Sequence, residues 1–164
     1  MLDFLEEVER KLHREIKLVA VDGTAMTLLG LKPSTLEIAF TGSLWDIIEF
    51  EEAHQSLYHS FDVRCWKDGQ LLTVSLPRDY MGKSIMIETN LTKIKLFALN
   101  PVDIVVAKIA GLKQRDWDDI ESCVNTYGLA AEDIRERCAS AKCTDNQTSF
   151  EANCDLLFSK LSRS

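Results

Sequence analysis

The chain has 164 residues, a length that predicts a single domain with enough sequence to bury a hydrophobic core. Its 26 acidic and 19 basic residues give a net charge of −7, which disfavours broad non-specific DNA binding because that binding depends on neutralising phosphates. No apolar run approaches the roughly 18 residues of a membrane-spanning helix, and the acidic N-terminus is unlike a signal peptide, so we expect a cytoplasmic protein with no membrane partner.

Residues 3–16 are predicted to form an amphipathic helix, because apolar residues recur at spacings of three and four. These residues are Leu5, Val8, Leu12 and Ile16. The apolar run at 18–21 then predicts a central strand buried on both faces. After a tight turn, a short helix over 24–29 should end at Gly30, since glycine commonly terminates helices.

A second strand is expected at 36–40, and it carries one carboxylate, that of Glu37. Side chains alternate between the two faces of a strand. The apolar face, which should meet the core, carries Leu36, Ile38 and Phe40. Glu37 and Ala39 share the other face, so we expect Glu37 to point to the open side of the sheet.

The middle of the chain predicts a helix followed by two pairs of strands. The helix covers 44–59, and its inward residues are Leu44, Ile47, Ile48 and Leu57. Strands at 61–66 and 71–76 flank Asp68-Gly69, a dipeptide that predicts a hairpin. The second pair, near 84–89 and 93–99, is joined around Asn90.

The last third of the chain predicts helices. Asn100-Pro101-Val102-Asp103 has the N-cap, proline and acid of a helix start, and this helix should reach about residue 112. Further helices are expected from Asp116 to Gly128, over 131–141, and after a polar loop at 143–148 from a capping box formed by Thr148 and Glu151.

This order of elements predicts an α+β fold within one domain spanning 1–164. A mixed β-sheet flanked by helices would occupy 1–99, and a helical C-terminal part would occupy 100–164. The five cysteines are odd in number and form no Cys-x-x-Cys pair, which argues against a disulfide framework and a zinc ribbon. Three of them have a spacing that could collect a metal, but no histidine lies near them, so ordinary thiols are favoured; they are Cys138, Cys143 and Cys154.

Two stretches carry a resemblance to a known family. The first runs from Val21 to Phe40, as strand, turn, helix and strand. The second is Asn-Pro-Val-Asp-Ile-Val-Val-Ala-Lys at 100–108, followed by Arg-Asp-Trp-Asp-Asp-Ile at 115–120. Over about residues 1–130 the chain resembles small prokaryotic nucleotidyltransferase-like proteins of the DNA polymerase beta-type superfamily. These are related to the nucleotidyltransferase toxins of bacterial toxin–antitoxin pairs.

The resemblance implies a nucleotide site at the turn and a magnesium site on the strand that follows. In the intact pattern, glycines let backbone N–H groups approach a triphosphate at a helix N-terminus. Two strand acids at i and i+2 and a third acid then hold two magnesium ions, which activate the attacking hydroxyl and stabilise the leaving pyrophosphate. In this chain the implied nucleotide-binding residues are Gly23, Thr24, Lys108 and Arg115, the implied metal ligands are Asp22 and Glu37, and Glu37 is the implied catalytic carboxylate.

The chain departs from the intact pattern at the phosphate and metal positions. Asp22 replaces the first glycine of the turn and puts a carboxylate where phosphate would lie. At about 6 Å and an effective dielectric constant near 20, this like-charge contact would cost roughly 3 kcal/mol. Ala39 stands where the second acid is needed, and the strand expected to carry the third acid has Lys95 and Phe97 outward. The acids on other strands that could replace it are Asp62 and Glu88.

Two interpretations stay open for each conspicuous charged residue. Glu37 is either a solvated or salt-bridged glutamate, or forms a rearranged magnesium site with Asp22. Lys108 either reaches a phosphate or extends to the surface. We expect Asp116 to cap the following helix, and Asp119 to pair with Arg115 or Lys108, so that the motif locks the sheet to the helices.

Three functional hypotheses follow from these features. The favoured one is a nucleotidyltransferase-fold protein that has lost metal-dependent transfer and acts in nucleotide binding or regulation. The second is an active transferase with a rearranged magnesium site built on Asp22 and Glu37. The third is a protein that binds a protein partner in a toxin–antitoxin-type pair, through its acidic surface or its helical half.

Overall fold

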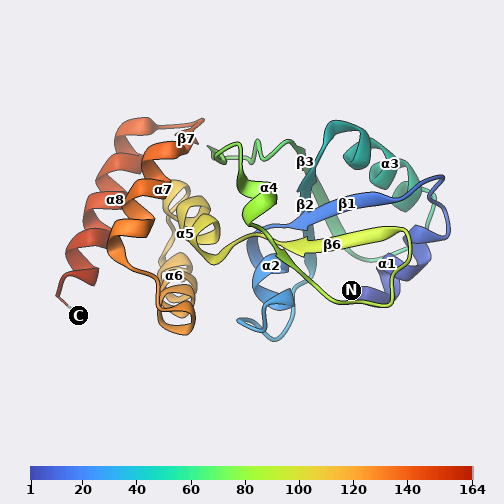
Figure 1. Cartoon of the computed structure of the whole chain (residues 1–164), viewed down its shortest axis with the longest axis horizontal. Coiled ribbons are helices and arrows are strands. Elements are labelled where there is room, and N and C mark those ends of the chain that lie inside the picture. The colour runs from blue at the N-terminus through green and yellow to red at the C-terminus, as the bar shows by residue number, and fades with distance from the viewer. Residues whose placement is uncertain (164) are drawn as a thin grey trace. The chain divides into compact units, whose positions relative to one another are not determined.

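The computed structural model describes residues 1–163, which fall into two compact units (Figure 1). The sheet unit comprises 1–68 and 81–99, and the helical unit comprises 69–80 and the residues from 100 onward. The predicted α+β class is confirmed, with a mixed sheet in the first part and helices in the C-terminal half. The chain passes from one unit to the other after residues 68, 80 and 99, and the single domain expected for 1–164 stays a prediction.

The sheet unit is built on five strands in the order β3-β2-β1-β6-β5. They are β1 (Ile16–Ala20), β2 (Glu37–Gly42), β3 (Asp62–Lys67), β5 (Ile85–Met86) and β6 (Ile94–Ala98). The central strand β1 runs antiparallel to β2 and parallel to β6. β3 is parallel to β2, and β5 is antiparallel to β6, as expected for the second strand pair.

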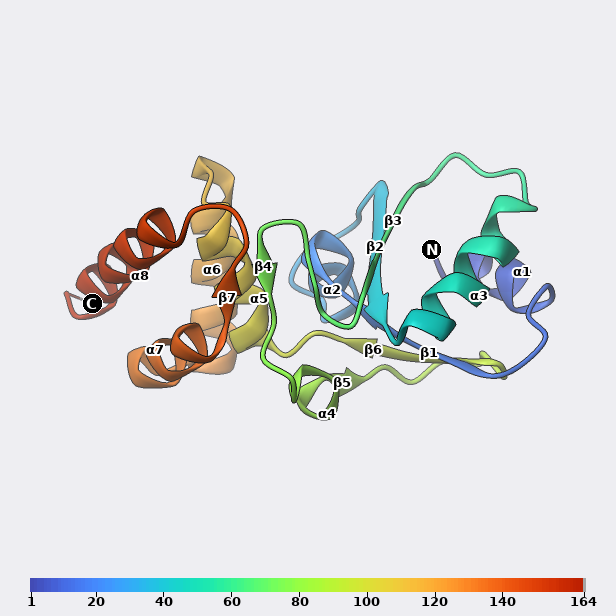
Figure 2. The same ribbon diagram turned by 90° about the horizontal axis from the view of Figure 1, so that it is seen from above.

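Three helices pack with this sheet: α1 (Leu2–Glu9), α2 (Asp22–Leu28) and α3 (Leu44–Gln55). α1 and α3 contact one another, as Figure 2 also shows. Phe40 of β2 meets Phe50 of α3 edge to face, with ring centroids 5.3 Å apart. The core of the unit is fully buried, and its largest side chains include Leu5, Ile16, Leu18, Met26, Ile38 and Leu96.

Several sequence predictions in this unit are wrong in detail. The helix expected over 44–59 ends at Gln55, and Leu44, which was expected to point inward, is 40% exposed. The first helix ends at Glu9 rather than near residue 16, because Ile16 pairs with Ile94 and so begins β1. Leu36 is 87% exposed, whereas Ala39 is only 1% exposed, so the face that Ala39 shares with Glu37 is covered beyond Glu37. β2 lies between β1 and β3, which explains why both of its faces are buried along most of its length.

The predicted hairpin around Asp68-Gly69 is also wrong. Both residues have positive φ, 50° and 72°, so the local turn forms. However, β3 pairs with β2, while β4 (Val74–Ser75) pairs with β7 (Lys142–Cys143) in a separate two-stranded sheet. Turn chemistry is local, whereas the partner of a strand depends on residues far away in the chain.

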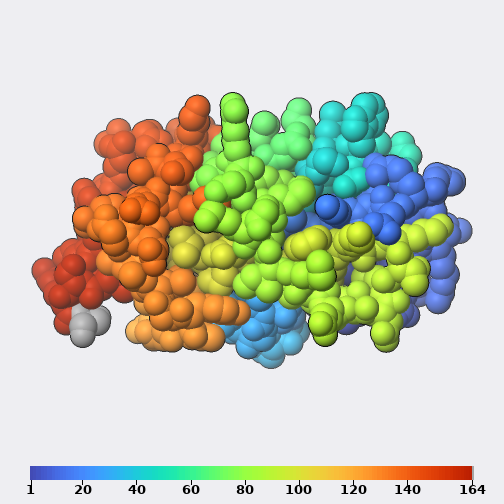
Figure 3. Space-filling model, viewed as in Figure 1, coloured from blue at the N-terminus to red at the C-terminus, as the bar shows by residue number. Residues whose placement is uncertain are grey.

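The helical unit contains α5 (Pro101–Ala110), α6 (Gln114–Tyr127), α7 (Ala131–Ser140) and α8 (Gln147–Leu161). α4 (Tyr80–Lys83) lies where the chain returns to the sheet unit. α5 packs against the other three helices, and the space-filling view shows the yellow and orange atoms of this unit in close contact (Figure 3). The core side chains include Ile104, Val105, Ile109, Ile120, Ile134 and Phe150.

Helix ends in this unit follow the sequence signals in part. The Asn100 side chain accepts a hydrogen bond from the Val102 amide at 3.0 Å, which confirms the predicted N-cap. Asp116 is not the N-cap of α6; it lies inside the first turn and accepts a hydrogen bond from the Lys113 amide at 2.7 Å. The cap of α8 is Asn146 rather than Thr148. In the described part of the chain, no helix combines the length and apolarity needed to cross a membrane.

A cluster of histidine and phenylalanine rings joins α1, α3 and the segment before β3. His54 Nδ1 and His59 Nε2 lie 3.3 Å apart, within hydrogen-bonding distance. Phe4 packs on His59 with ring centroids 4.7 Å apart, and Phe50 lies 5.3 Å from His54. Burial, together with the neighbouring His59, lowers the pKa of His54 from its ordinary value of 6.5.

Acidification is therefore expected to destabilise the protein through His54. Because its folded-state pKa lies below 6.5, the unfolded state binds more protons, so the stabilisation is complete above 6.5 and is lost as pH falls through the folded pKa. Urea unfolding at several values between about pH 5 and 8 measures this slope. His54→Phe should flatten it, whereas the exposed His13→Phe should not; equal slopes for His54→Phe and the parent protein would contradict the assignment.

Candidate functional site

The residues implied as a site fall in both units. Asp22, Gly23, Thr24 and Glu37 belong to the sheet unit, and Lys108 and Arg115 belong to the helical unit. Each group has a defined local environment, and these environments show what each side chain already binds.

The turn before α2 keeps a conformation that favours glycine. Asp22 is the first residue of α2 and has a φ of 48°. That value lies in the left-handed region, which glycine adopts freely and aspartate tolerates better than most other residues. The backbone of the glycine turn thus persists at the position where the chain carries a carboxylate instead.

Thr24 ties α2 to β2. Its side chain is 1% exposed, and its hydroxyl donates to the Glu37 carbonyl at 3.1 Å and accepts from the Ala39 amide at 2.9 Å. A Cβ added at Gly23 would lie 3.4 Å from Thr35 Oγ1, so little space remains there. The hydroxyl of Thr24 is therefore engaged with the strand, and the nucleotide-binding role of Gly23 and Thr24 stays a prediction.

Glu37 lies beside an arginine. Its carboxylate is 3.7 Å from Arg64 Nε, and Arg64 Nη2 is 3.3 Å from an Asp62 oxygen. The parallel register of β2 and β3 explains this grouping, since it sets Glu37 opposite Asp62 and Ala39 opposite Arg64. The guanidinium of Arg64 thus contacts both carboxylates, and the salt-bridged interpretation of Glu37 is the one observed.

The residues present do not fit the two-magnesium centre that the resemblance implies. Such a centre needs several oxygen ligands converging on the metals, whereas Ala39 offers none. Throughout residues 1–163, no group of three or more histidine, cysteine, aspartate or glutamate side chains could hold a metal ion. Glu88 follows β5, at the sheet edge opposite to β3. A weaker pairing of Asp22 with Glu37 stays a prediction.

Lys108 is held by two carboxylates within the helical unit. Its ammonium lies 2.7 Å from Asp119 and 3.4 Å from Asp116, and the side chains of the three residues are about one-tenth exposed. The Arg-Asp-x-x-Asp motif therefore ties α5 to α6. These ion pairs lie inside the helical unit. The prediction that the motif holds the sheet part to the helices is therefore not what the ion pairs show. Arg115 is exposed on α6, and its nucleotide-binding role stays a prediction.

Sequence reasoning missed a second buried ion pair in this unit. Asp103 is completely buried, and its two oxygens accept hydrogen bonds from Arg137 at 2.5 and 2.9 Å. Arg137 also contacts Asp79 at 2.7 Å. Hydrogen bonding to Asp103 is the main cause that raises the pKa of Arg137. The sequence held one signal for this pair, since Asp103 lies on a predicted helix that is otherwise mostly apolar. A charge buried on such a helix requires a partner of opposite charge.

Comparison with known protein families places residues 2–164 in the family described as nucleotidyltransferase of unknown function (DUF6036). The chain belongs to this family. The comparisons found no matching curated protein and no matching solved structure. Family membership supports the predicted nucleotidyltransferase-like character.

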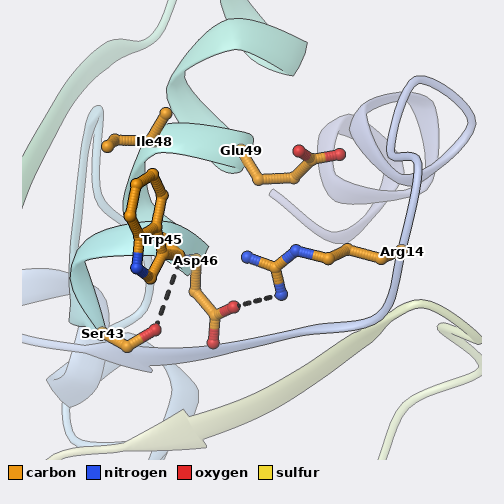
Figure 4. Close-up of a pocket in the computed structure, with 6 residues that line it drawn as sticks. All are labelled: Arg14, Ser43, Trp45, Asp46, Ile48 and Glu49. Atoms are coloured by element: carbon orange, nitrogen blue, oxygen red, sulfur yellow. Dashed lines mark hydrogen bonds and ion pairs between the residues drawn. The ribbon is translucent and has the colours of Figure 1, made fainter.

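This DUF6036 protein also has a cavity of about 520 Å³ beside the start of α3 (Figure 4). Arg14 points to Asp46, at 2.6 Å, and the other oxygen of Asp46 accepts from the Lys17 amide at 3.1 Å. Glu49 accepts from the His13 amide at 2.7 Å. These contacts bind the segment before β1 to α3, so the polar groups of the cavity already serve the fold.

Three polar side chains near the predicted site residues of this DUF6036 chain, or among them, already have partners within the protein. Arg64 neutralises the sheet carboxylates, Thr24 bonds to β2, and Lys108 binds two aspartates. This arrangement does not provide the clustered carboxylate oxygens that metal-dependent activation of a hydroxyl requires.

Proposed function

We propose that this member of the DUF6036 family does not perform two-metal nucleotidyl transfer at Glu37, and that it acts as a nucleotide-binding or regulatory protein. The observation that carries the proposal is the position of Arg64. Its guanidinium contacts both Glu37 and Asp62, where the intact pattern would need a divalent cation between carboxylates. The strand neighbour of Arg64 is Ala39, where that pattern has its second acid.

Arg64 neutralises the charge of the two carboxylates but contributes little to the free energy of unfolding. The side chains of Glu37, Asp62 and Arg64 are 42%, 62% and 50% exposed. Exposed ion pairs of this kind contribute about 0 to 1 kcal/mol. A magnesium ion at Glu37 would compete with a cation that the chain itself supplies, and would gain few oxygen ligands in return. This supports loss of metal-dependent transfer, whereas the proposal of nucleotide binding rests on the resemblance and on family membership.

Calorimetry and a transfer assay together test this proposal. The protein is titrated with ATP, CTP, GTP and UTP, each with and without magnesium, and then incubated with the α-labelled nucleotides and total tRNA. We expect no transfer of label above that of Glu37→Gln, and equal nucleotide affinities for the two proteins. Transfer by the parent protein that Glu37→Gln abolishes would overturn the proposal.

An active transferase with a rearranged site is the second candidate, because the sheet register brings Asp62 next to Glu37. It requires Arg64 to leave both carboxylates and Asp22 to contribute a ligand. Arg64→Ala separates the two candidates: a large gain in manganese binding and transfer activity favours the rearranged site. A partner role in a toxin–antitoxin-type pair is the third candidate, supported by the resemblance and the net charge of −7. A cytoplasmic location stays a proposal.

A further inference from the structure

A groove between α6 and α8 opens on the surface of the helical unit. It has a volume of about 570 Å³ and is lined mainly by apolar side chains. The principal ones are Trp117, Ile120, Val124, Leu129, Leu157 and Leu161. Of these, only Ile120 and Leu157 are fully buried, so the others still present apolar surface to solvent. Pockets of this size and composition are typical of binding sites.

The charged residues of the groove are mostly basic. Lys160 and Arg163 line it together with a single acid, Glu121. The Lys160 ammonium lies over the Trp117 ring, 4.0 Å from its centroid, in a cation–π contact. The whole chain carries a net charge of −7, so the lining of the groove is more positive than the protein as a whole. An acidic ligand would be favoured here and repelled over much of the remaining surface.

The backbone around the groove restricts what kind of chain segment can bind. The lining residues belong to α6, to α8, to the first residue of α7 and to the segments that follow α6 and α8. Helical backbone groups are already hydrogen-bonded within their helices. An extended segment would therefore find no strand edge to pair with, whereas a helix satisfies its own backbone and needs only an apolar groove.

We propose that this groove binds the apolar face of an amphipathic helix from a partner protein, with acidic residues of that helix facing Lys160 and Arg163. Apolar anchors at i, i+3 or i+4 and i+7 of the ligand helix would fill the groove beside Trp117. The residues of α6 that line the groove run from Trp117 to Asn125, and those of α8 lie near its C-terminal end. This stretch of α6 corresponds to about 12 Å of helix axis, which matches about two turns of a bound helix. None of the predicted nucleotide-binding residues lines this groove, and the inference goes beyond nucleotide binding.

Fluorescence anisotropy with two designed peptides tests the proposal on the full chain. Both are helical and carry leucine at i, i+3, i+4 and i+7, with glutamate at the remaining positions of one and lysine at those of the other. We expect the glutamate peptide to bind at least tenfold more tightly than the lysine peptide. We also expect the double variant Lys160→Glu with Arg163→Glu to bind the glutamate peptide at least tenfold more weakly than the parent protein does.

Lys142→Glu is the matched control, since it changes the charge of an exposed lysine on β7 in the same unit. It should leave peptide affinity unchanged. Equal affinities for the two peptides, or equal losses for Lys142→Glu and the Lys160 and Arg163 double variant, would overturn the proposal. Sedimentation that shows a dimer dispersed by the double variant would assign the groove to a second copy of this chain, and would also overturn it.

Discussion

Replacing Arg137 with methionine is expected to lower the free energy of unfolding by about 3 to 5 kcal/mol, because it removes the partner of a buried charge. Asp103 is 0% exposed, and both of its oxygens accept hydrogen bonds from Arg137. Methionine fills similar space but donates nothing, so the carboxylate would stay buried without its counter-ion. Urea unfolding followed by circular dichroism measures the loss.

Two further variants isolate the cause of that loss. Arg135→Met removes another arginine of α7, whose side chain is 58% exposed and pairs with the exposed Glu132. Its guanidinium also lies 4.7 Å from the Phe158 ring centroid. Contacts of this exposed kind contribute about 1 kcal/mol or less. Asp103→Leu added to Arg137→Met should recover much of the stability, and a double variant as unstable as Arg137→Met alone would rule out the buried charge as the cause.

Replacing Lys108 with methionine is expected to cost about 3 kcal/mol or more, since removing one member of a buried ion pair is strongly destabilising. Lys108 lies 2.7 Å from Asp119 and 3.4 Å from Asp116, and all three side chains are nearly buried. Without the ammonium, two carboxylates of α6 would face each other and the apolar surface of α5. The free energy of unfolding in urea gives the size of the effect.

Arg115→Met is the matched control for Lys108, because Arg115 is exposed on the same helix as the two aspartates. Its loss should change stability by about 0.5 kcal/mol or less. The same pair of variants separates folding from nucleotide binding. Lower nucleotide affinity for Arg115→Met at unchanged stability would support its predicted role as a ligand, and unchanged stability for Lys108→Met would contradict the structural role of the ion pairs.

The local features of the chain could be predicted well from neighbouring residues. Asn100 caps α5, Gly128 ends α6 with a φ of 60°, and the turn at Asp22 keeps the left-handed backbone that a glycine would adopt. Each of these depends on residues within one or two turns of chain, whose sterics and hydrogen bonds are visible in the sequence. The motif that contains Lys108, Asp116 and Asp119 also lies within a short stretch.

One feature of the candidate metal site could also be predicted from the sequence. The side chain of Ala39 has no oxygen, so the loss of a carboxylate ligand at the second acid position follows from the sequence alone. Family membership agrees with the nucleotidyltransferase-like character that the resemblance implied. What the spacing could not reveal was which residues stand beside Glu37.

The α+β class, most helix ends and the lack of an acid at position 39 could be predicted from the amino-acid sequence. The folded structure was needed to show that β3 pairs with β2, that Arg64 therefore contacts Glu37, and that Arg137 meets Asp103 across 34 residues of chain. The physical reason is the range of the interactions. Caps and turns are closed by adjacent residues, whereas strand partners and buried ion pairs depend on which distant segments the packed core brings together.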